Sequence, residues 1–295
     1  MTGPEQGFLL LTSNLGDPCR KPLTVAQFRE LAKRVQAGNR EKESRDLTPS
    51  DLTALGYHPS MAEHIFSLLS GTRQLREYLS RAESFDCYPI TRLDPLYPIP
   101  VRHRMGLDSP CVLWAKGDVT LLGKPAVAVI GSRDLNVENH AFAEEAGRQI
   151  AKQGYVLISG NARGADKTAQ RACLEAGGKV ISVVADSLQK QPLVRNVLYL
   201  ALDDYDAAFS SQRALHRNHV IHTLASVTLA AQWTLGKGGT WDGILANVKH
   251  GWTPVCIFDD RSDAAAELQN RGVRLIHEED LQDLSALTVD TMGFI

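Results

Sequence analysis

Several features that would point to a particular class of protein are missing from this sequence. No apolar run approaches the roughly 20 residues that a membrane-spanning helix needs. The N-terminal residues lack the basic start and the long apolar core of a secretory signal peptide. The five cysteines are scattered and form no CxxC pair, so neither a disulfide framework nor a zinc site is indicated. These absences predict a cytoplasmic protein with no membrane contact and no metal.

An excess of positive charge is also missing. The 295 residues include 32 Lys and Arg against 34 Asp and Glu, which gives a formal net charge of -2. This balance argues against a protein coated in cations for duplex DNA. A local basic groove is still compatible with it, because binding responds to the local field more than to the total charge.

The N-terminal part of the chain has the pattern of short helices. Val25, Phe28, Leu31 and Val35 fall on one helical face, and two further amphipathic stretches lie at 59–70 and 73–82. The polar, charged stretch at 36–51 predicts a loop between helices. Helices this short are not stable alone and must pack on each other, so we predict a small all-helical domain over residues 1–84.

Further along, the pattern changes to alternating strands and helices. Amphipathic stretches predict helices at 138–152 and 166–176. Short apolar runs without polar interruptions are typical of parallel strands that are covered on both faces. Such runs predict strands at 126–130, 155–158, 180–184, 227–231, 255–258 and 273–276.

We therefore predict an α/β fold with a small helical domain in front of it. The core, over residues 125–285, is a Rossmann-like, mostly parallel sheet with helices on both faces. A connecting segment at 85–124 contributes a first strand near 111–114, and its prolines exclude a long helix. Residues 286–295 form a C-terminal tail.

Glycine-rich turns follow three of the predicted strands. In an open parallel sheet, ligands bind beyond the carboxyl ends of the strands. Glycines let backbone N–H groups approach a ligand, and helix N-termini favour anions. Three such turns on one rim predict a phosphate or polyanion site where Arg133, Arg163 and Lys237 converge. The residues assigned to the site from these turns are Gly131, Ser132, Arg133, Ser159, Gly160, Arg163, Gly164, Asp166, Lys237, Gly238, Gly239 and Thr240.

The second of these turns also has a purely structural explanation. Asp166 can cap its helix with Arg163 paired to it, and Gly160 and Gly164 can simply form a tight turn. For any single residue of the turn, this explanation stands beside the functional one.

Other known motifs are absent or do not fit. The Walker A pattern GxxxxGK[ST] does not occur, and no GxGxxG follows Ile130. His216, His219 and His222 are spaced three apart, and on a helix the outer two diverge by about 120°, so they do not predict a metal site.

The order of the motifs resembles the DprA (Smf) family of bacterial DNA-processing proteins. The matching segments, within residues 94–284, are VAVIGSR, VLISGNARGADKTAQRACLEAGGKVISVV, RNHVIHTLAS and GKGGT. The resemblance implies a Rossmann-like core that binds single-stranded DNA without a cofactor, helps to load a RecA-type recombinase and often forms a homodimer. It implies that Arg133 and Arg163 face the DNA phosphates. It also adds Arg217 and Asn218, from the RNR stretch of the family, to the site; His219 replaces the second arginine of that stretch.

Three tryptophans have two possible roles. Single strands need flat groups for their bases, and Trp233, Trp241 and Trp252 could supply them. A tryptophan near an α/β sheet is more often part of the core, which is the interpretation we favour for each.

Related Rossmann-like proteins of the SLOG/LOG superfamily suggest alternatives to DNA binding. LOG-like hydrolases cleave an N-glycosidic bond and carry PGGxGTxxE. Here Gly243 stands in place of the catalytic Glu, and Asp242 is the only nearby carboxylate. A nucleotide-binding sensor, for example in phage defence, would show a similar sequence. We favour single-stranded DNA binding in DNA processing or recombination, without catalysis, and keep the sensor and the hydrolase as alternatives.

Overall fold

Helices precede the first strand, as the sequence predicts. The computed structural model describes residues 1–38, 47–202 and 204–289. Its N-terminal helices are α1 (Gly3–Thr12), α2 (Val25–Ala37), α3 (Pro49–Ala54), α4 (Pro59–Leu69) and α5 (Thr72–Glu83). The first three begin where they do because Thr2, Thr24 and Thr48 each form a capping box. The loop predicted at 36–51 is too long, since α3 starts at Pro49; residues 39–46 lie outside the described residues.

The strands of the described residues form one sheet in the order β1-β2-β6-β5-β4-β3-β7-β8-β9. The pairs from β6 to β9 are parallel, whereas β1 pairs with β2 and β2 with β6 in antiparallel fashion. The mostly parallel sheet is therefore confirmed. The strands are β1 (Tyr88–Thr91), β2 (Val112–Gly117), β3 (Ala126–Gly131), β4 (Val156–Ser159), β5 (Lys179–Val183), β6 (Val197–Ala201), β7 (Val227–Ala231), β8 (Val255–Phe258) and β9 (Arg274–Ile276).

Two strands were not predicted. Strand β6 is as apolar as its neighbours, but only a short 3-10 turn, Leu188–Lys190, separates it from β5, so the expected alternation of strand and helix breaks there. Strand β1 contains Pro89, which is tolerated because β1 is the edge of the sheet.

Helices cover both faces of the sheet. One face is covered by α7 (Val137–Lys152) and α8 (Ala165–Glu175). Phe142 of α7 and Ala169 of α8 belong to the same apolar cluster as Val127 and Val129 of β3. The other face is covered by α9 (Ser211–Leu224), α10 (Gly239–His250) and α11 (Asp263–Asn270), with the short α6 (Ile99–Met105) beside them. No helix in the described part of the chain is long and apolar enough to cross a membrane.

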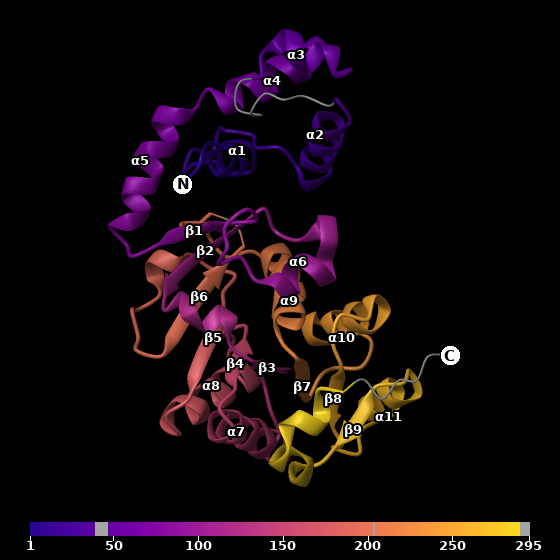
Figure 1. Ribbon diagram of the computed structural model, residues 1–295. Helices are drawn as coiled ribbons and strands as arrows, with labels where there is room; N and C mark the ends of the chain where they lie inside the picture. The colour runs from indigo at the N-terminus through magenta and orange to yellow at the C-terminus, as the bar shows by residue number, and fades with distance from the viewer. Residues whose placement is uncertain (39–46, 203, 290–295) are drawn as a thin grey trace.

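The N-terminal helices have a small core of their own but also pack on the sheet. Leu31, Leu52 and Ile65 belong to a separate apolar cluster within the helices. In contrast, Leu9 of α1 and Tyr78 of α5 belong to the same cluster as the core of the sheet. Figure 1 shows these helices as a layer over the β1–β2 end of the sheet. The domain boundary at residue 84 stays a prediction.

A buried histidine ties α9 to the sheet and to α10. His222 is 1% exposed, and its Nδ1 lies 3.1 Å from Thr228 Oγ1 and 3.0 Å from Asn247 Nδ2. The Asn247 oxygen accepts the Thr253 N–H, so the Asn247 amide nitrogen donates to Nδ1 and the ring proton sits on Nε2. Burial lowers the pKa of His222 to about 3, so the ring is neutral at pH 7.

This histidine predicts loss of stability in acid. In the unfolded chain His222 binds a proton near pH 6.5, while in the folded chain it does so only near pH 3. The free energy of unfolding should therefore fall as the pH drops from 7 to 4, by up to about 1.4 kcal/mol per pH unit from this residue. Urea unfolding of His222→Gln should show lower stability at pH 7 but a smaller loss on acidification. The exposed control His103→Gln should keep the wild-type pH dependence. Equal acid losses in wild type and His222→Gln would contradict the assignment.

Candidate nucleic-acid interface

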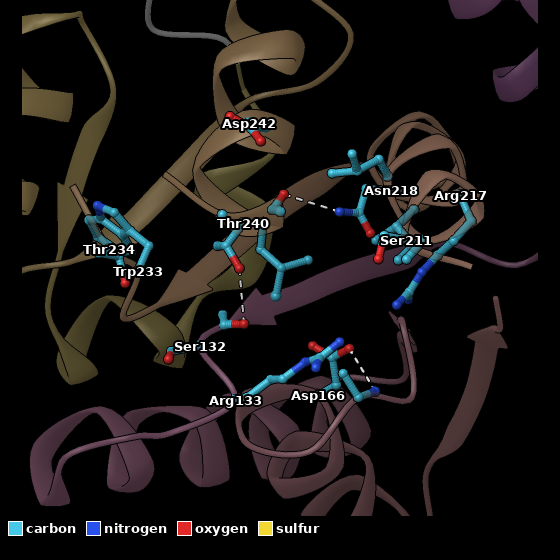
Figure 2. A pocket seen from close by; sticks show the side chains of 18 of the residues that line it. Ser132, Arg133, Asp166, Ser211, Arg217, Asn218, Trp233, Thr234, Thr240 and Asp242 are labelled. Atoms are coloured by element: carbon cyan, nitrogen blue, oxygen red, sulfur yellow. Dashed lines mark hydrogen bonds between the residues drawn. The ribbon is translucent and has the colours of Figure 1, made fainter. Parts of the chain in front are cut away.

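The strand order of the sheet reverses at β3. The chain leaves β3 through α7 to reach β4 on one side, while β7 pairs with β3 on the other side. Loops that leave the carboxyl ends of β3 and β7 therefore diverge and open a crevice between them. A pocket of about 540 Å³ lies there. The turns after β3 and β7, the start of α8, and helices α9 and α10 form its walls (Figure 2).

Most of the predicted site residues line this pocket. They are Gly131, Ser132, Arg133, Asp166, Arg217, Asn218, Lys237, Gly238, Gly239 and Thr240. Three cations thus reach one crevice from three elements: the turn after β3, helix α9 and the turn before α10. Figure 2 shows Arg133 and Arg217 directed from different walls toward Asp166.

Arg217 is buried although it carries a charge. Only 8% of the residue is exposed; its Nη1 donates to Val183 O at 3.0 Å, and its Nε has no partner among the described residues. Burial lowers the pKa of Arg217, the negative charge of Asp166 counteracts this, and the nearby Arg133 adds to it. A buried donor without an acceptor is unfavourable, so Arg217 is kept in this position at a cost that the charge of Asp166 partly offsets.

Asp166 holds the turn after β4 rather than capping α8. One carboxylate oxygen accepts the N–H groups of Gly160 at 3.0 Å and Ala162 at 3.1 Å. Helix α8 begins at Ala165 with Gly164 as its N-cap residue, so the capping explanation is wrong. Burial raises the pKa of Asp166, which the charge of Arg217 and the two backbone hydrogen bonds partly oppose. The turn therefore packs Gly160 directly against Arg217, where a Cβ would lie 1.3 Å from Arg217 Nη1, so only glycine fits.

Four predicted residues, Ser159, Gly160, Arg163 and Gly164, do not line the pocket. Ser159 is fully buried and accepts a hydrogen bond from Gln170. Gly164 has a φ of +84°, and a Cβ there would lie 2.2 Å from the carbonyl oxygen of Ser132, so it seats one turn against the other. Arg163 is exposed and pairs with Asp134 at 2.8 Å, not with Asp166. Of the three cations predicted to converge, Arg133 and Lys237 line the pocket and Arg163 does not; the third cation there is Arg217, which the family resemblance had added.

The N-terminus of α10 forms another wall. Thr240 Oγ1 donates to Gly131 O at 3.0 Å, and Asn218 Nδ2 donates to Gly239 O at 3.1 Å, so the start of α10 is fixed to both β3 and α9. The first N–H groups of a helix have no partner within the helix and carry partial positive charge. With Lys237 beside them, they favour an anion at this wall.

The three tryptophans lie in the core, and a different aromatic residue is exposed at the pocket. Trp233, Trp241 and Trp252 are 7%, 5% and 9% exposed, which agrees with the core interpretation. Trp233 also borders the pocket, and its Nε1–H donates to Ala264 O at 3.3 Å. Phe209 was not among the predicted site residues, yet it lines the pocket and is 54% exposed. Its position in the sequence, in a polar loop directly before the helix that carries Arg217, could have pointed to it.

The structure also shows where the candidate metal ligands and the residues of the hydrolase alternative lie. No group of three metal-binding side chains occurs among the described residues, and His216, His219 and His222 do not form one. Asp242 lines the pocket on α10. The next residue, Gly243, packs against α9 so closely that a Cβ would lie 3.0 Å from His222 Nε2. A side chain at this position would therefore press on the buried His222 ring, which would have to shift by a few tenths of an ångström.

Comparisons with known proteins bear on the fold and the family. The profile of the family described as DNA recombination-mediator protein A matches residues 89–285. The DNA processing protein DprA of Bacillus subtilis is 35% identical over 83 residues, which cover 28% of this chain and 28% of that protein. DprA of Streptococcus pneumoniae is 26% identical over 220 residues, or 70% of this chain and 73% of that protein. The chain thus spans less than a third of one of these curated relatives and more than two thirds of the other.

Solved structures show the same fold. The X-ray structure of DprA from Streptococcus pneumoniae has a TM-score of 0.74 at 22% identity, over 97% of this chain and 98% of that one. A structure of DprA from Helicobacter pylori, solved to explain its single-stranded DNA-binding mode, has a TM-score of 0.58 at 25% identity. It covers 68% of this chain and 94% of that one.

Fold and pocket together define a class: a Rossmann-like α/β protein with a cationic crevice at the switch point of its sheet. Within that class, the profile match over more than half of the sequence identifies the family. The chain belongs to the DNA recombination-mediator protein A (DprA) family, as its motifs predicted.

The carboxylate of Asp166 can be tested through stability. Because both backbone N–H groups donate to one oxygen, Asp166→Asn keeps an acceptor for them, whereas Asp166→Ala leaves them without one and should cost about 1–3 kcal/mol. The pKa of Asp166 is raised in the folded state, so its folded form gains stability as the pH falls. In urea unfolding at pH 7 and pH 5, wild type should therefore gain on Asp166→Asn in acid. The exposed control Asp134→Asn should show no such gain. A shift in the opposite direction would contradict the burial argument.

Proposed function

We propose that this protein binds single-stranded DNA through the crevice at the switch point and carries out no chemistry on it. One observation carries the proposal: three cations, a helix N-terminus and an exposed aromatic ring surround a single open pocket. A cationic groove suits the phosphates of a single strand, and an aromatic face suits its bases. The DprA protein from Helicobacter pylori, whose single-stranded DNA binding has been described, shares this fold.

The residues divide into two roles. Arg133 can form two parallel hydrogen bonds to a phosphate, with the Ser132 hydroxyl beside it. Lys237 and the N-terminal N–H groups of α10 supply a second contact for the backbone. Phe209, at the mouth of the same pocket, supplies the surface on which a base can stack.

We also propose a protein partner and an assembly. The description of the family as recombination mediators supports a RecA-type recombinase as the partner. The working unit that we propose is a homodimer in the cytoplasm, on the resemblance stated from the sequence. Arg163, Gly164 and the buried Ser159 then act indirectly, because they shape or flank the pocket without lining it.

The alternatives receive less support. The hydrolase needs a carboxylate at the position of Gly243, where this chain has no side chain and where a Cβ would lie 3.0 Å from His222 Nε2. Asp242 is one residue away, which turns its side chain by about 100° around the helix. A nucleotide-binding sensor would use the same phosphate contacts, so direct titration separates the two hypotheses: a sensor binds a mononucleotide saturably, whereas the DNA-binding proposal predicts that tight binding needs an oligonucleotide.

The phosphate contact predicts a salt-dependent effect of Arg133→Ala. In fluorescence anisotropy with a labelled single-stranded oligonucleotide, the variant should lose about tenfold or more in affinity, the value of a charge-assisted hydrogen bond. The slope of log affinity against log salt should become shallower by about 0.7, because one phosphate contact is gone. The control Arg171→Ala removes an exposed arginine that pairs with Glu175, away from the pocket, and should bind as wild type does. Absence of binding by wild type would overturn the proposal and direct attention to mononucleotides.

The stacking contact predicts a different signature for Phe209→Ala. The variant should lose about 1–3 kcal/mol of binding free energy, because base stacking on an aromatic ring has that value. Its salt slope should stay at the wild-type value, since no phosphate contact is removed. Phe209→Tyr should retain most of the affinity. A changed salt slope in Phe209→Ala, or an equal loss in Phe209→Tyr, would show that Phe209 does not act by stacking.

A further inference from the structure

Phe209 lies at the end of a loop whose other end is attached to the N-terminal helices. Residues 204–209, here called the 204–209 segment, lie between β6 and α9. The segment starts with Asp204, Tyr205 and Asp206 and ends with Phe209 at the pocket. The same short stretch therefore touches both the helical layer and the proposed DNA site.

The segment is attached to the N-terminal helices by hydrogen bonds from residues after α1 and from α5. Ser13, which follows α1, donates its hydroxyl to Asp204, and the Asn14 N–H donates to the same carboxylate at 3.1 Å. Tyr78 of α5 donates its hydroxyl to Asp206 Oδ1 at 2.8 Å. Two aspartates of the segment are thus held by residues that lie far from them in the sequence.

An aromatic cluster reinforces the attachment. The ring of Tyr205 is 1% exposed and lies 4.8 Å from the ring of Tyr78 and 5.0 Å from that of Trp114, centroid to centroid. Tyr205 is therefore clamped between α5 and strand β2. Its immediate neighbour Asp206 accepts the hydroxyl of the same Tyr78, so one tyrosine of α5 contacts two consecutive residues of the segment.

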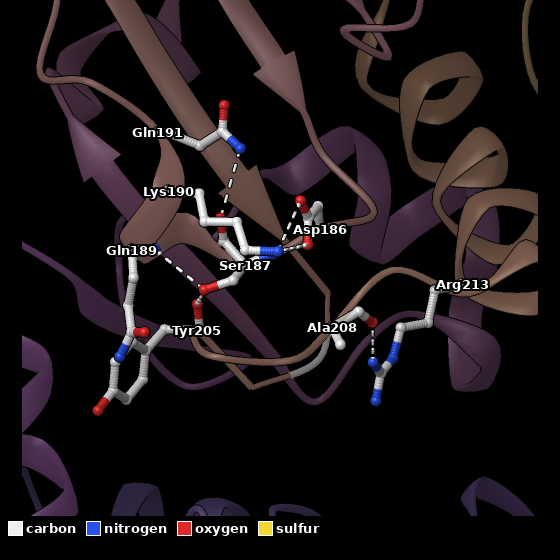
Figure 3. A network of polar contacts seen from close by, with 8 residues as sticks. All are labelled: Asp186, Ser187, Gln189, Lys190, Gln191, Tyr205, Ala208 and Arg213. Atoms are coloured by element: carbon white, nitrogen blue, oxygen red, sulfur yellow. Dashed lines mark hydrogen bonds and ion pairs between the residues drawn. The ribbon is translucent and has the colours of Figure 1, made fainter.

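The core side of the segment is held through its backbone. The carbonyl oxygen of Tyr205 accepts the Ser187 hydroxyl at 3.1 Å and the Leu188 N–H at 2.8 Å. Arg213 of α9 donates to the carbonyl oxygen of Ala208, which directly precedes Phe209. Figure 3 shows this network, with Tyr205 on one side and Ala208 and Arg213 on the other. The segment is thus fixed at Tyr205–Asp206 and again at Ala208.

We propose that the N-terminal helices set the position of Phe209, with Tyr78 and Asp206 as positioning residues for DNA binding. This inference rests on the proposed function, because it assigns a purpose to the place of Phe209 in the pocket. An exposed ring on a free loop samples many positions, and binding must then order it. A ring held in place in advance loses less entropy on binding, so affinity rises without any new contact to DNA.

The experiment compares variants in single-stranded DNA binding and in hydrogen exchange. Tyr78→Phe removes the hydroxyl that Asp206 accepts and keeps the ring that packs on Tyr205. Asp206→Ala removes the acceptor of the same hydrogen bond at a partly exposed position and leaves both tyrosine rings in place. The matched control is Tyr97→Phe, which removes another buried tyrosine hydroxyl, bonded at 2.7 Å to Pro110 O, far from the segment in sequence.

We expect Tyr78→Phe and Asp206→Ala each to weaken oligonucleotide binding about threefold to tenfold, in the range of coupled neighbouring sites. Hydrogen exchange of the 204–209 segment should become faster in both, and Tyr97→Phe should match wild type in both measurements. In a Phe209→Ala background, the two substitutions should cause no further loss of affinity, because the ring that they position is gone. If the effect were purely structural, the losses of binding free energy would add, so the fold-losses of affinity would multiply.

Each outcome decides the question. Wild-type affinity in both variants, or losses that multiply with that of Phe209→Ala, would overturn the positioning role. The proposed function would stay in place if Arg133→Ala still binds about tenfold or more weakly than wild type. If wild type binds no DNA, the proposed function fails. Hydrogen exchange of the 204–209 segment then decides alone whether Tyr78 and Asp206 hold this segment in place. Unchanged exchange in Tyr78→Phe and Asp206→Ala would then overturn the positioning role as well.

Discussion

The candidate site depends on two oppositely charged side chains buried at the bottom of the crevice. Asp166 is 6% and Arg217 is 8% exposed, and each shifts the pKa of the other toward the charged form against the effect of burial. Neither charge would be tolerated there alone. Their mutual compensation lets the turn after β4 fold under the pocket and lets α9 lie close enough for Gly160 to touch the guanidinium. Arg133 lies near enough to this pair for its charge to lower the pKa of both groups.

This arrangement explains how a protein with a net charge of -2 can present a cationic surface. Arg133, Arg217 and Lys237 arrive at one edge of the sheet from three elements, and with the two carboxylates of the same pocket, Asp166 and Asp242, they leave one net positive charge there (three minus two). The reversal of strand order at β3 creates the space between them. The local field, and not the total charge, is what a phosphate in the crevice would experience.

Particular residues show where reasoning from sequence succeeded and where it stopped. The strands at 227–231 and 255–258 agree with the structure to the residue, because buried parallel strands are continuously apolar and their ends are polar. Arg163 was expected beside Arg133, yet it pairs with Asp134 on the surface, since the direction of a side chain in a tight turn does not follow from the motif. Phe209 escaped notice because its loop has no pattern of its own and is placed by Tyr78 and Asp206.

The family, the α/β class and the glycine-rich turns could be inferred from the residues alone, because they depend on local patterns and on the order of motifs along the chain. Three other features became known only from the folded molecule: which cations meet, that Asp166 holds a turn instead of capping a helix, and that the N-terminal helices reach the loop beside the pocket. The cause of this difference is distance along the chain. Tyr78 and Asp206, or Gly160 and Arg217, are brought together by packing between elements, and no local pattern records which partner a side chain will find there.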